Sequence, residues 1–346
     1  MAEKRKQFYG FDVLKFIMAV LVAARHMIQV FFPESSPWRL LVGSWLSNLA
    51  VPVFLVIAGF LLFRKVPEPG TEDWRATGRR TVFKYCMRIL KLYLLWCVLY
   101  WPIDTYNYLH GVESLGLTIR NYIKSFFFSS TIAQLWYLPA LLVACLIVWL
   151  CYSATRRIWP VLLVTGALFV MGCLGDNWYF NQRLPMAVQQ VLFAYLRHCV
   201  TMRNGVFYGA FYVAIGLFFA RKKWRLPFLV SAVGAALSIG LMYKEVVRCS
   251  NTNMTFMAVP AACFLVEAAL AVNWKEQKFC PRLRIASEWI YLFHFYIFYV
   301  FSWTAPFNPI PLTEKNIALL NLIPLVLFAW MMACLSERYK WLKKLI

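Results

Sequence analysis

The sequence predicts an all-α membrane protein, a polytopic bundle of about ten transmembrane helices with both termini in the cytoplasm. Composition is the first reason: 62% of the 346 residues are hydrophobic and 15% are charged, whereas about a quarter of the residues in soluble domains are charged. The second reason is that apolar runs reach about twenty residues, the length of a membrane-crossing helix. Barrel strands are about half as long and alternate in polarity. The third reason is the distribution of lysine and arginine.

Ten apolar runs mark the predicted spans, at residues 11–32, 42–63, 83–101, 134–152, 158–174, 203–220, 226–243, 254–273, 286–305 and 316–335. With the N-terminus inside, the inner loops and tails hold 23 lysines and arginines, and the outer loops hold 9. Cytoplasmic loops carry such an excess of positive charge. The charge count therefore supports ten spans and two cytoplasmic termini.

Residues 1–346 are expected to form a single transmembrane domain with no soluble domain, because no segment is long and polar enough for one. The net charge of +21 comes from basic residues in short loops, which argues against a nucleic-acid partner. The ten cysteines show no CxxC or Cys/His spacing, so we expect no metal site. Residues 186–199 have an amphipathic pattern that predicts a helix on the outer face.

The first span, FDVLKFIMAVLVAARHMIQVFF, carries four ionisable residues: Asp12, Lys15, Arg25 and His26. Such groups are costly inside a membrane, which makes them candidates for function. Lys15 and His26 are eleven residues apart, so they share one helical face at a separation of about 16 Å. An imidazole can take a proton from a hydroxyl near neutral pH; the alternative is a histidine that only holds neighbouring helices together. Lys15 could bind an anion or pair with Asp12.

The third span begins in a basic cluster on its cytoplasmic side, formed by Arg79, Arg80, Lys84, Arg88 and Lys91. A polyanionic ligand such as a nucleotide diphosphate would suit this cluster. The alternative is a positive flank whose side chains extend toward the membrane interface.

Two further candidates lie in later spans. Arg203 and Asn204 open the sixth span from the outer side, where they could bind a sugar or orient a nucleophile. His294 lies near the middle of the ninth span. The plainer interpretation is a structural histidine whose hydrogen bonds are made within the helix bundle.

Six segments, in order along the chain, carry a family resemblance: FDVLKFIMAVLVAARH at 11–26, VPVFLVIAGFLL at 51–62, RILKLY at 88–93, LWYL at 135–138, RNGVFYGAFYVAIG at 203–216 and SEWIYLFH at 287–294. Together they resemble the acyltransferase-3 family of integral membrane acyltransferases, in its Gram-positive-type branch. The sequence departs from the family pattern in having Lys15 for arginine, Ala58 for serine and Leu94 for proline. Arg25 matches nothing in that pattern.

The resemblance implies a bacterial plasma (inner) membrane enzyme that moves an acyl group, acetyl above others, from cytoplasmic acyl-CoA to a hydroxyl of a cell-surface, exported or lipid-linked glycan. It implies His26 as the catalytic residue, acting as a base or transiently acylated. The other implied roles are donor binding by Lys15, Arg79, Arg80, Arg88 and Lys91, acceptor binding or oxyanion stabilisation by Arg203 and Asn204, and support from Asp12, His294, Trp136 and Tyr137.

Some family members carry a fused hydrolase or racemase domain. Residues 336–346 leave no room for either, so we expect a standalone membrane module. The alternative to an enzyme is a glycan exporter or a membrane ligand sensor, which needs a polar path but no acyl donor. The missing inverted repeat weakens the exporter interpretation.

Overall fold

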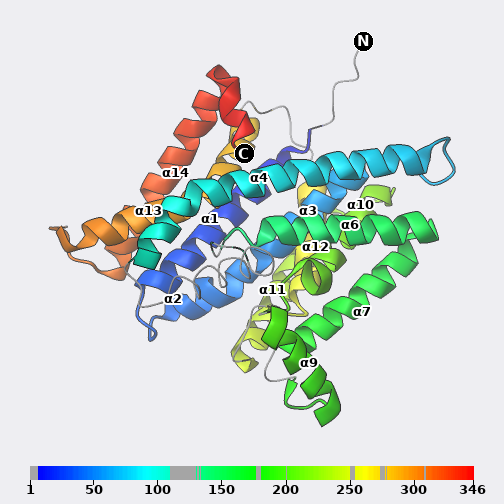
Figure 1. Ribbon diagram of the computed structural model, residues 1–346, viewed down its shortest axis with the longest axis horizontal. Coiled ribbons are helices and arrows are strands. Elements are labelled where there is room, and N and C mark those ends of the chain that lie inside the picture. The colour runs from blue at the N-terminus through cyan, green and yellow to red at the C-terminus, as the bar shows by residue number, and fades with distance from the viewer. Residues whose placement is uncertain are drawn as a thin grey trace. The chain divides into compact units, whose positions relative to one another are not determined.

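The computed structural model describes residues 7–109, 130, 132, 134–176, 181–199, 201–249, 254–272, 277, 279–307 and 309–346 (Figure 1). Helices make up its regular structure, and the described residues contain no strand. The chain divides into two compact units, which we describe separately. The first unit is Met1–Phe54, Trp224–Tyr243 and Met257–Ile346, and the second is Leu55–Lys223 and Lys244–Phe256.

The first unit is built around three long helices. Its elements are α1 (Tyr9–Phe31), α2 (Pro37–Leu40), η1 (Leu41–Trp45), η2 (Leu46–Leu49), most of α11 (Phe228–Arg248), α12 (Ala258–Ala271), α13 (Cys280–Thr304), η4 (Ala305–Phe307), α14 (Glu314–Arg338) and η5 (Lys340–Lys344). α13 packs against both α1 and α14. It runs antiparallel to α14, because Arg282 pairs with Glu337 while Phe293 stacks on Phe328.

α1 and α13 run parallel. Asp12 contacts Arg284 near the start of both helices, and His26 contacts His294 further along both. Two membrane helices are parallel when an odd number of crossings separates them. The predicted first and ninth spans fit this relation, since seven predicted spans lie between them.

The end of α1 is closed by an arginine from the segment that follows it. Arg39 donates from Nη2 to the carbonyl oxygens of Gln29 and Phe32, at 3.1 and 2.8 Å. The last carbonyls of a helix have no partner within the helix. Arg39 supplies one, which fixes where the chain turns after α1.

The second unit contains most of α3 (Ala50–Phe63), together with α4 (Trp74–Leu109), α6 (Tyr137–Thr155), α7 (Ile158–Asp176), α9 (Met186–Cys199), η3 (Gly205–Gly209) and α10 (Ala210–Arg221). α3 and α10 approach closely at two glycines. A Cβ at Gly59 would collide with the backbone of Val213, and one at Gly216 would collide with the backbone of Val56. Small residues permit such close contact between membrane helices.

Each of the ten predicted spans coincides with a helix or helical run of the structure. Among the described residues, seven helical segments are long and apolar enough to cross a membrane. Gly205–Arg221 and Ala258–Ala271 are shorter apolar helices, and α4 begins with the basic cluster. The helix predicted at residues 186–199 is confirmed as α9. Ten crossings, cytoplasmic termini and a single domain stay predictions.

Exposed side chains on these helices are largely apolar. Leu163 is 73% exposed on α7 and Leu229 is 72% exposed on α11. In water such surfaces would be unfavourable, so these faces are suited to contact lipid. The chain is therefore a multi-pass membrane protein.

Candidate active site

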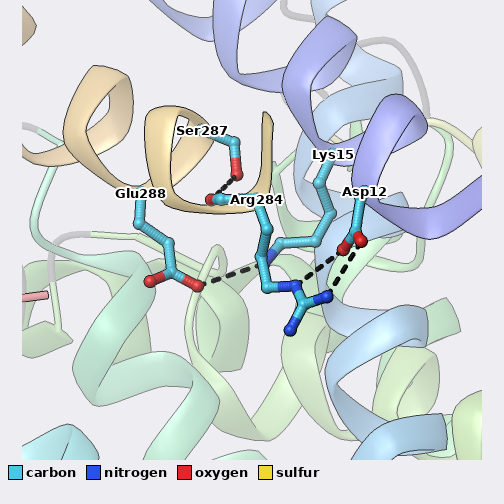
Figure 2. A network of polar contacts seen from close by, with 5 residues as sticks. All are labelled: Asp12, Lys15, Arg284, Ser287 and Glu288. Atoms are coloured by element: carbon cyan, nitrogen blue, oxygen red, sulfur yellow. Dashed lines mark hydrogen bonds and ion pairs between the residues drawn. The ribbon is translucent and has the colours of Figure 1, made fainter. Parts of the chain in front are cut away.

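One end of the α1–α13 interface is held by charge. Asp12 is buried and accepts two hydrogen bonds from Arg284, with 2.8 Å from Nε to Oδ1 and 2.9 Å from Nη2 to Oδ2 (Figure 2). Lys15 places Nζ 3.4 Å from Oε1 of Glu288. We call these four residues the charged end. The pairing of Asp12 with Lys15, one of the two alternatives for Lys15, is not found, because each residue has an opposite charge on the facing helix instead.

The backbone of α13 is tied in at the same place. Ser287 Oγ donates to the carbonyl oxygen of Arg284 at 2.7 Å, as Figure 2 shows. The planar guanidinium group matches a carboxylate in two parallel hydrogen bonds, which fixes direction as well as distance. This explains why Asp12 bonds with an arginine across the interface rather than a lysine in its own helix.

Sequence reasoning missed Arg284 and Glu288 as site residues. Arg284 was assigned to a cytoplasmic loop, because the predicted span began at residue 286. The helix in fact begins at Cys280, with Pro281 in its first turn. Proline is favoured at that position, so it was a usable signal for the earlier start.

The other end of the interface is formed by two histidines, which we call the histidine end. The rings of His26 and His294 are stacked, with centroids 5.4 Å apart and planes 21° apart. Phe295 packs against both, at centroid distances of 5.1 Å from His26 and 4.9 Å from His294. His26 is half-buried, whereas His294 is fully buried. The structure thus brings together two residues that the sequence predicted separately.

The hydrogen bonding of His294 fixes its tautomer. Its Nδ1 lies 3.0 Å from the carbonyl oxygen of Ile290. A carbonyl oxygen only accepts, so Nδ1 carries the proton and Nε2 presents a lone pair. That Nε2 is buried and has no hydrogen-bond partner among the described residues. A buried polar atom without a partner calls for an explanation.

Arg25 has a structural contact beside His26. Its Nη1 donates to Oδ1 of Asn48 at 2.8 Å and to Oγ of Ser47 at 3.3 Å. Both acceptors lie in η2, the 3₁₀ segment that follows the π-helical turn η1. Arg25 therefore joins α1 to this irregular helical run, in keeping with its absence from the family pattern.

Four of the five predicted donor-binding cations lie on α4 and have exposed side chains, namely Arg79, Arg80, Arg88 and Lys91. The fifth, Lys15, lies on α1 and is half-buried. Arg80, Lys84, Arg88 and Lys91 share one helical face because their spacings of four, four and three residues return to the same side. Arg79 is nine residues before Arg88 and so points to the opposite side of the helix. The structure therefore groups Arg80, Arg88 and Lys91 but leaves Arg79 outside the group.

The predicted acceptor residues precede the π-helical turn η3 in the second unit. Asn204 accepts from the backbone N–H groups of Val206 and Phe207 at 2.9 and 3.1 Å, and its Nδ2 donates to the Tyr195 hydroxyl at 2.8 Å. Asparagine is a preferred residue at this capping position. These contacts give Asn204 a structural role, and its acceptor role stays a prediction.

Arg203 meets one of the predicted supporting residues. Its Cζ lies 5.3 Å from the ring centroid of Trp136, and its Nε is buried without a hydrogen-bond partner in the described part of the chain. Tyr137 is the first residue of α6. No group of three described side chains is suited to hold a metal ion.

A family model described as an acyltransferase domain matches residues 8–336. This chain belongs to the acyltransferase-3 family. The chain is similar to an amino-acid racemase of Enterococcus faecalis, with 24% identity over 96% of the chain and 46% of the relative. It is also similar to a serine/alanine racemase of Enterococcus gallinarum, with 23% identity over 83% of the chain and 40% of the relative. The chain thus spans less than half the length of these relatives. No solved structure is a significant match.

In this acyltransferase-3 chain, the predicted site residues divide between the units. Asp12, Lys15, His26 and His294 all lie at the α1–α13 interface of the first unit. Arg203 and Trp136 lie together in the second unit, which also carries the cations of α4. The polar residues of the first unit are thus arranged along one pair of helices rather than scattered.

Proposed function

We propose that this chain is an O-acyltransferase of the bacterial plasma membrane that moves an acyl group, acetyl first, from acyl-CoA to a glycan hydroxyl. The observation that carries the proposal is the half-buried His26 stacked on His294, in a chain whose family is that of an acyltransferase domain. An imidazole held on a helix inside a membrane protein is suited to proton transfer with a hydroxyl.

In the proposed reaction, His26 takes the proton of the acceptor hydroxyl while the hydroxyl oxygen attacks the thioester carbonyl carbon. A carbon–oxygen bond forms and the carbon–sulfur bond breaks. The leaving CoA thiolate takes the proton from the imidazolium, which returns His26 to its starting state. In the covalent variant, the His26 imidazole attacks the thioester carbonyl carbon, a carbon–nitrogen bond forms and the CoA thiolate leaves. The acceptor hydroxyl oxygen then attacks the acyl-imidazole carbonyl carbon, the carbon–nitrogen bond breaks, and the hydroxyl proton passes through the imidazole to the CoA thiolate.

The cations of α4 are the proposed binding site for the phosphates of the donor. Arg80, Lys84, Arg88 and Lys91 form a basic row on one face, and Arg80, Lys84 and Lys91 have no carboxylate partner among the described residues. Guanidinium groups bind phosphate oxygens in pairs. Lys15 is placed differently, because Glu288 already neutralises its charge. A donor contact at Lys15 would require that ion pair to open.

The proposed acceptor contacts are those of Arg203 and Trp136. The guanidinium lies over the indole ring, and its Nε has no hydrogen-bond partner among the described residues, which leaves it available for a ligand in this proposal. Hydroxyl and ring-oxygen acceptors of a sugar would suit this donor. The racemase names belong to relatives more than twice as long as the segment matched, and we assign no racemase activity to this chain.

Reconstitution in liposomes tests the proposed function. The purified protein, given acetyl-CoA labelled in the acetyl group and a cell-envelope glycan fraction, should transfer label to the glycan. Succinyl-CoA in a parallel assay identifies the preferred acyl group. Mass spectrometry of surface glycans from cells with and without the protein should show the loss of one acyl mass. A glycan exporter or a ligand sensor would transfer no label, and that result would reject the enzyme.

A further inference from the structure

We propose that His294 positions the acceptor by accepting a hydrogen bond at Nε2 from a second hydroxyl, next to the one that reacts. The acceptor would then be a molecule with neighbouring hydroxyls, such as the vicinal diol of a sugar. This inference rests on the proposed function and assigns a substrate class to the same site.

The protein binds one nitrogen of His294 and leaves the other available. Nδ1 donates to Ile290 within its own helix, so the tautomer with a lone pair on Nε2 is fixed. Nε2 lies at the end of the side chain away from the backbone and is buried without a partner in the described structure. A hydrogen-bond donor supplied by a ligand would satisfy it.

Packing alone does not account for a histidine at this position. Phe295 and Phe298 are ring neighbours of His294, at centroid distances of 4.9 and 5.5 Å. Another phenylalanine would fill an aromatic site of this kind without burying an unsatisfied acceptor, whose desolvation is unfavourable. The nitrogen is the property that phenylalanine lacks.

The position beside His26 identifies the group that would bind. A reacting hydroxyl has one proton, and in the proposed reaction that proton goes to His26. The Nε2 of His294 must therefore accept from a different donor on the same molecule. The stacked rings have centroids 5.4 Å apart, so in this proposal two hydroxyls on adjacent carbons each bond with one imidazole.

Three substitutions of His294 distinguish the role of Nδ1 from the role of Nε2. Asparagine can replace Nδ1 and keep the bond to Ile290, glutamine can place an amide oxygen near Nε2, and phenylalanine keeps only the ring. We expect His294→Phe and His294→Asn to lower kcat/KM for the glycan acceptor by roughly 5- to 150-fold, the effect of one lost hydrogen bond. His294→Gln should recover part of that loss, and the KM for acetyl-CoA should stay unchanged in all three.

The reconstituted assay with labelled acetyl-CoA and the envelope glycan fraction measures these constants, with melting temperature as the check on folding. A diol test accompanies it. trans-Cyclohexane-1,2-diol should inhibit transfer more strongly than cyclohexanol in the native protein, and this preference should disappear in His294→Asn and return in His294→Gln. If kcat/KM for the glycan acceptor in His294→Asn equals or exceeds that in His294→Gln, His294 is structural and the inference is overturned. The same holds if His294→Phe matches the native protein in kcat/KM. If the native protein transfers no label, the proposed function itself has failed.

Discussion

The two ends of the α1–α13 interface satisfy their polar groups in different ways. At the charged end, each of the four charged side chains has an opposite charge on the facing helix. At the histidine end, ring stacking holds the side chains together and His294 keeps an unbonded Nε2. Polar groups that satisfy one another hold helices in place, whereas an unsatisfied one calls for an explanation. The comparison thus contrasts a structural contact with the contact to which we assign the proposed chemistry, within one helix pair.

The strongest test of this comparison is the loss of His26. His26→Ala should reduce acyl transfer by at least about 100-fold, because it removes the base or nucleophile. The labelled acetyl-CoA assay measures the rate. Gln29→Ala is the matched control, since Gln29 is an exposed residue one turn further along α1. Full activity of His26→Ala would exclude the mechanism.

The next effect concerns Arg284. Arg284→Ala leaves the buried carboxylate of Asp12 without its partner, and we expect a loss of about 2 kcal/mol in stability, below the value for fully buried pairs. Arg284 is 40% exposed, which reduces the cost through solvent screening. Thermal unfolding in detergent measures the loss. The reversed pair, Asp12→Arg with Arg284→Asp, should recover part of it; no recovery would mean that the two residues act independently.

A smaller effect is expected at Lys15. Lys15→Arg should be tolerated. Lys15→Glu places its carboxylate beside that of Glu288 and should lower the free energy of unfolding by about 1 kcal/mol. The double change Lys15→Glu with Glu288→Lys separates two roles. If the ion pair is what matters, stability and acyl transfer both return. A persistent increase in the KM for acetyl-CoA would instead support the predicted donor contact of Lys15.

The smallest effect is expected at the pair between Arg282 and Glu337. It has two hydrogen bonds of 2.9 Å, but both side chains are exposed. Exposed ion pairs contribute little. Arg282→Ala should therefore leave the melting temperature and the transfer rate near those of the native protein. A loss as large as that of Arg284→Ala would show that burial does not distinguish these pairs.

The sequence predicted the features that depend on local spacing. Lys15 and His26 face α13 together because eleven residues of regular helix bring them to one side. The apolar runs located every long helix, and the amphipathic pattern located α9. Simple helical arithmetic would also have separated Arg79 from Arg88.

What the sequence could not predict depends on which helices meet. Nothing within residues 11–32 indicates that Asp12 bonds with a residue 272 positions away. The stacking of His26 on His294 likewise requires α1 and α13 to be parallel neighbours. The capping contacts of Asn204 were not predicted, although capping is a common use of asparagine before a helix; its acceptor or oxyanion role stays a prediction. Local patterns give elements and faces, whereas partners come from packing.

The salt link between Asp12 and Arg284 sets the axial register of α13 against α1. A slip of α13 by one helical turn moves it about 5.4 Å, which would separate the guanidinium from the carboxylate and offset the two imidazole rings. Asp12 lies fourteen residues before His26, about 21 Å along the helix. Alignment of the two imidazole rings is therefore maintained from the far end of the interface, and a substitution at Asp12 is expected to displace His26 relative to His294 without touching either ring.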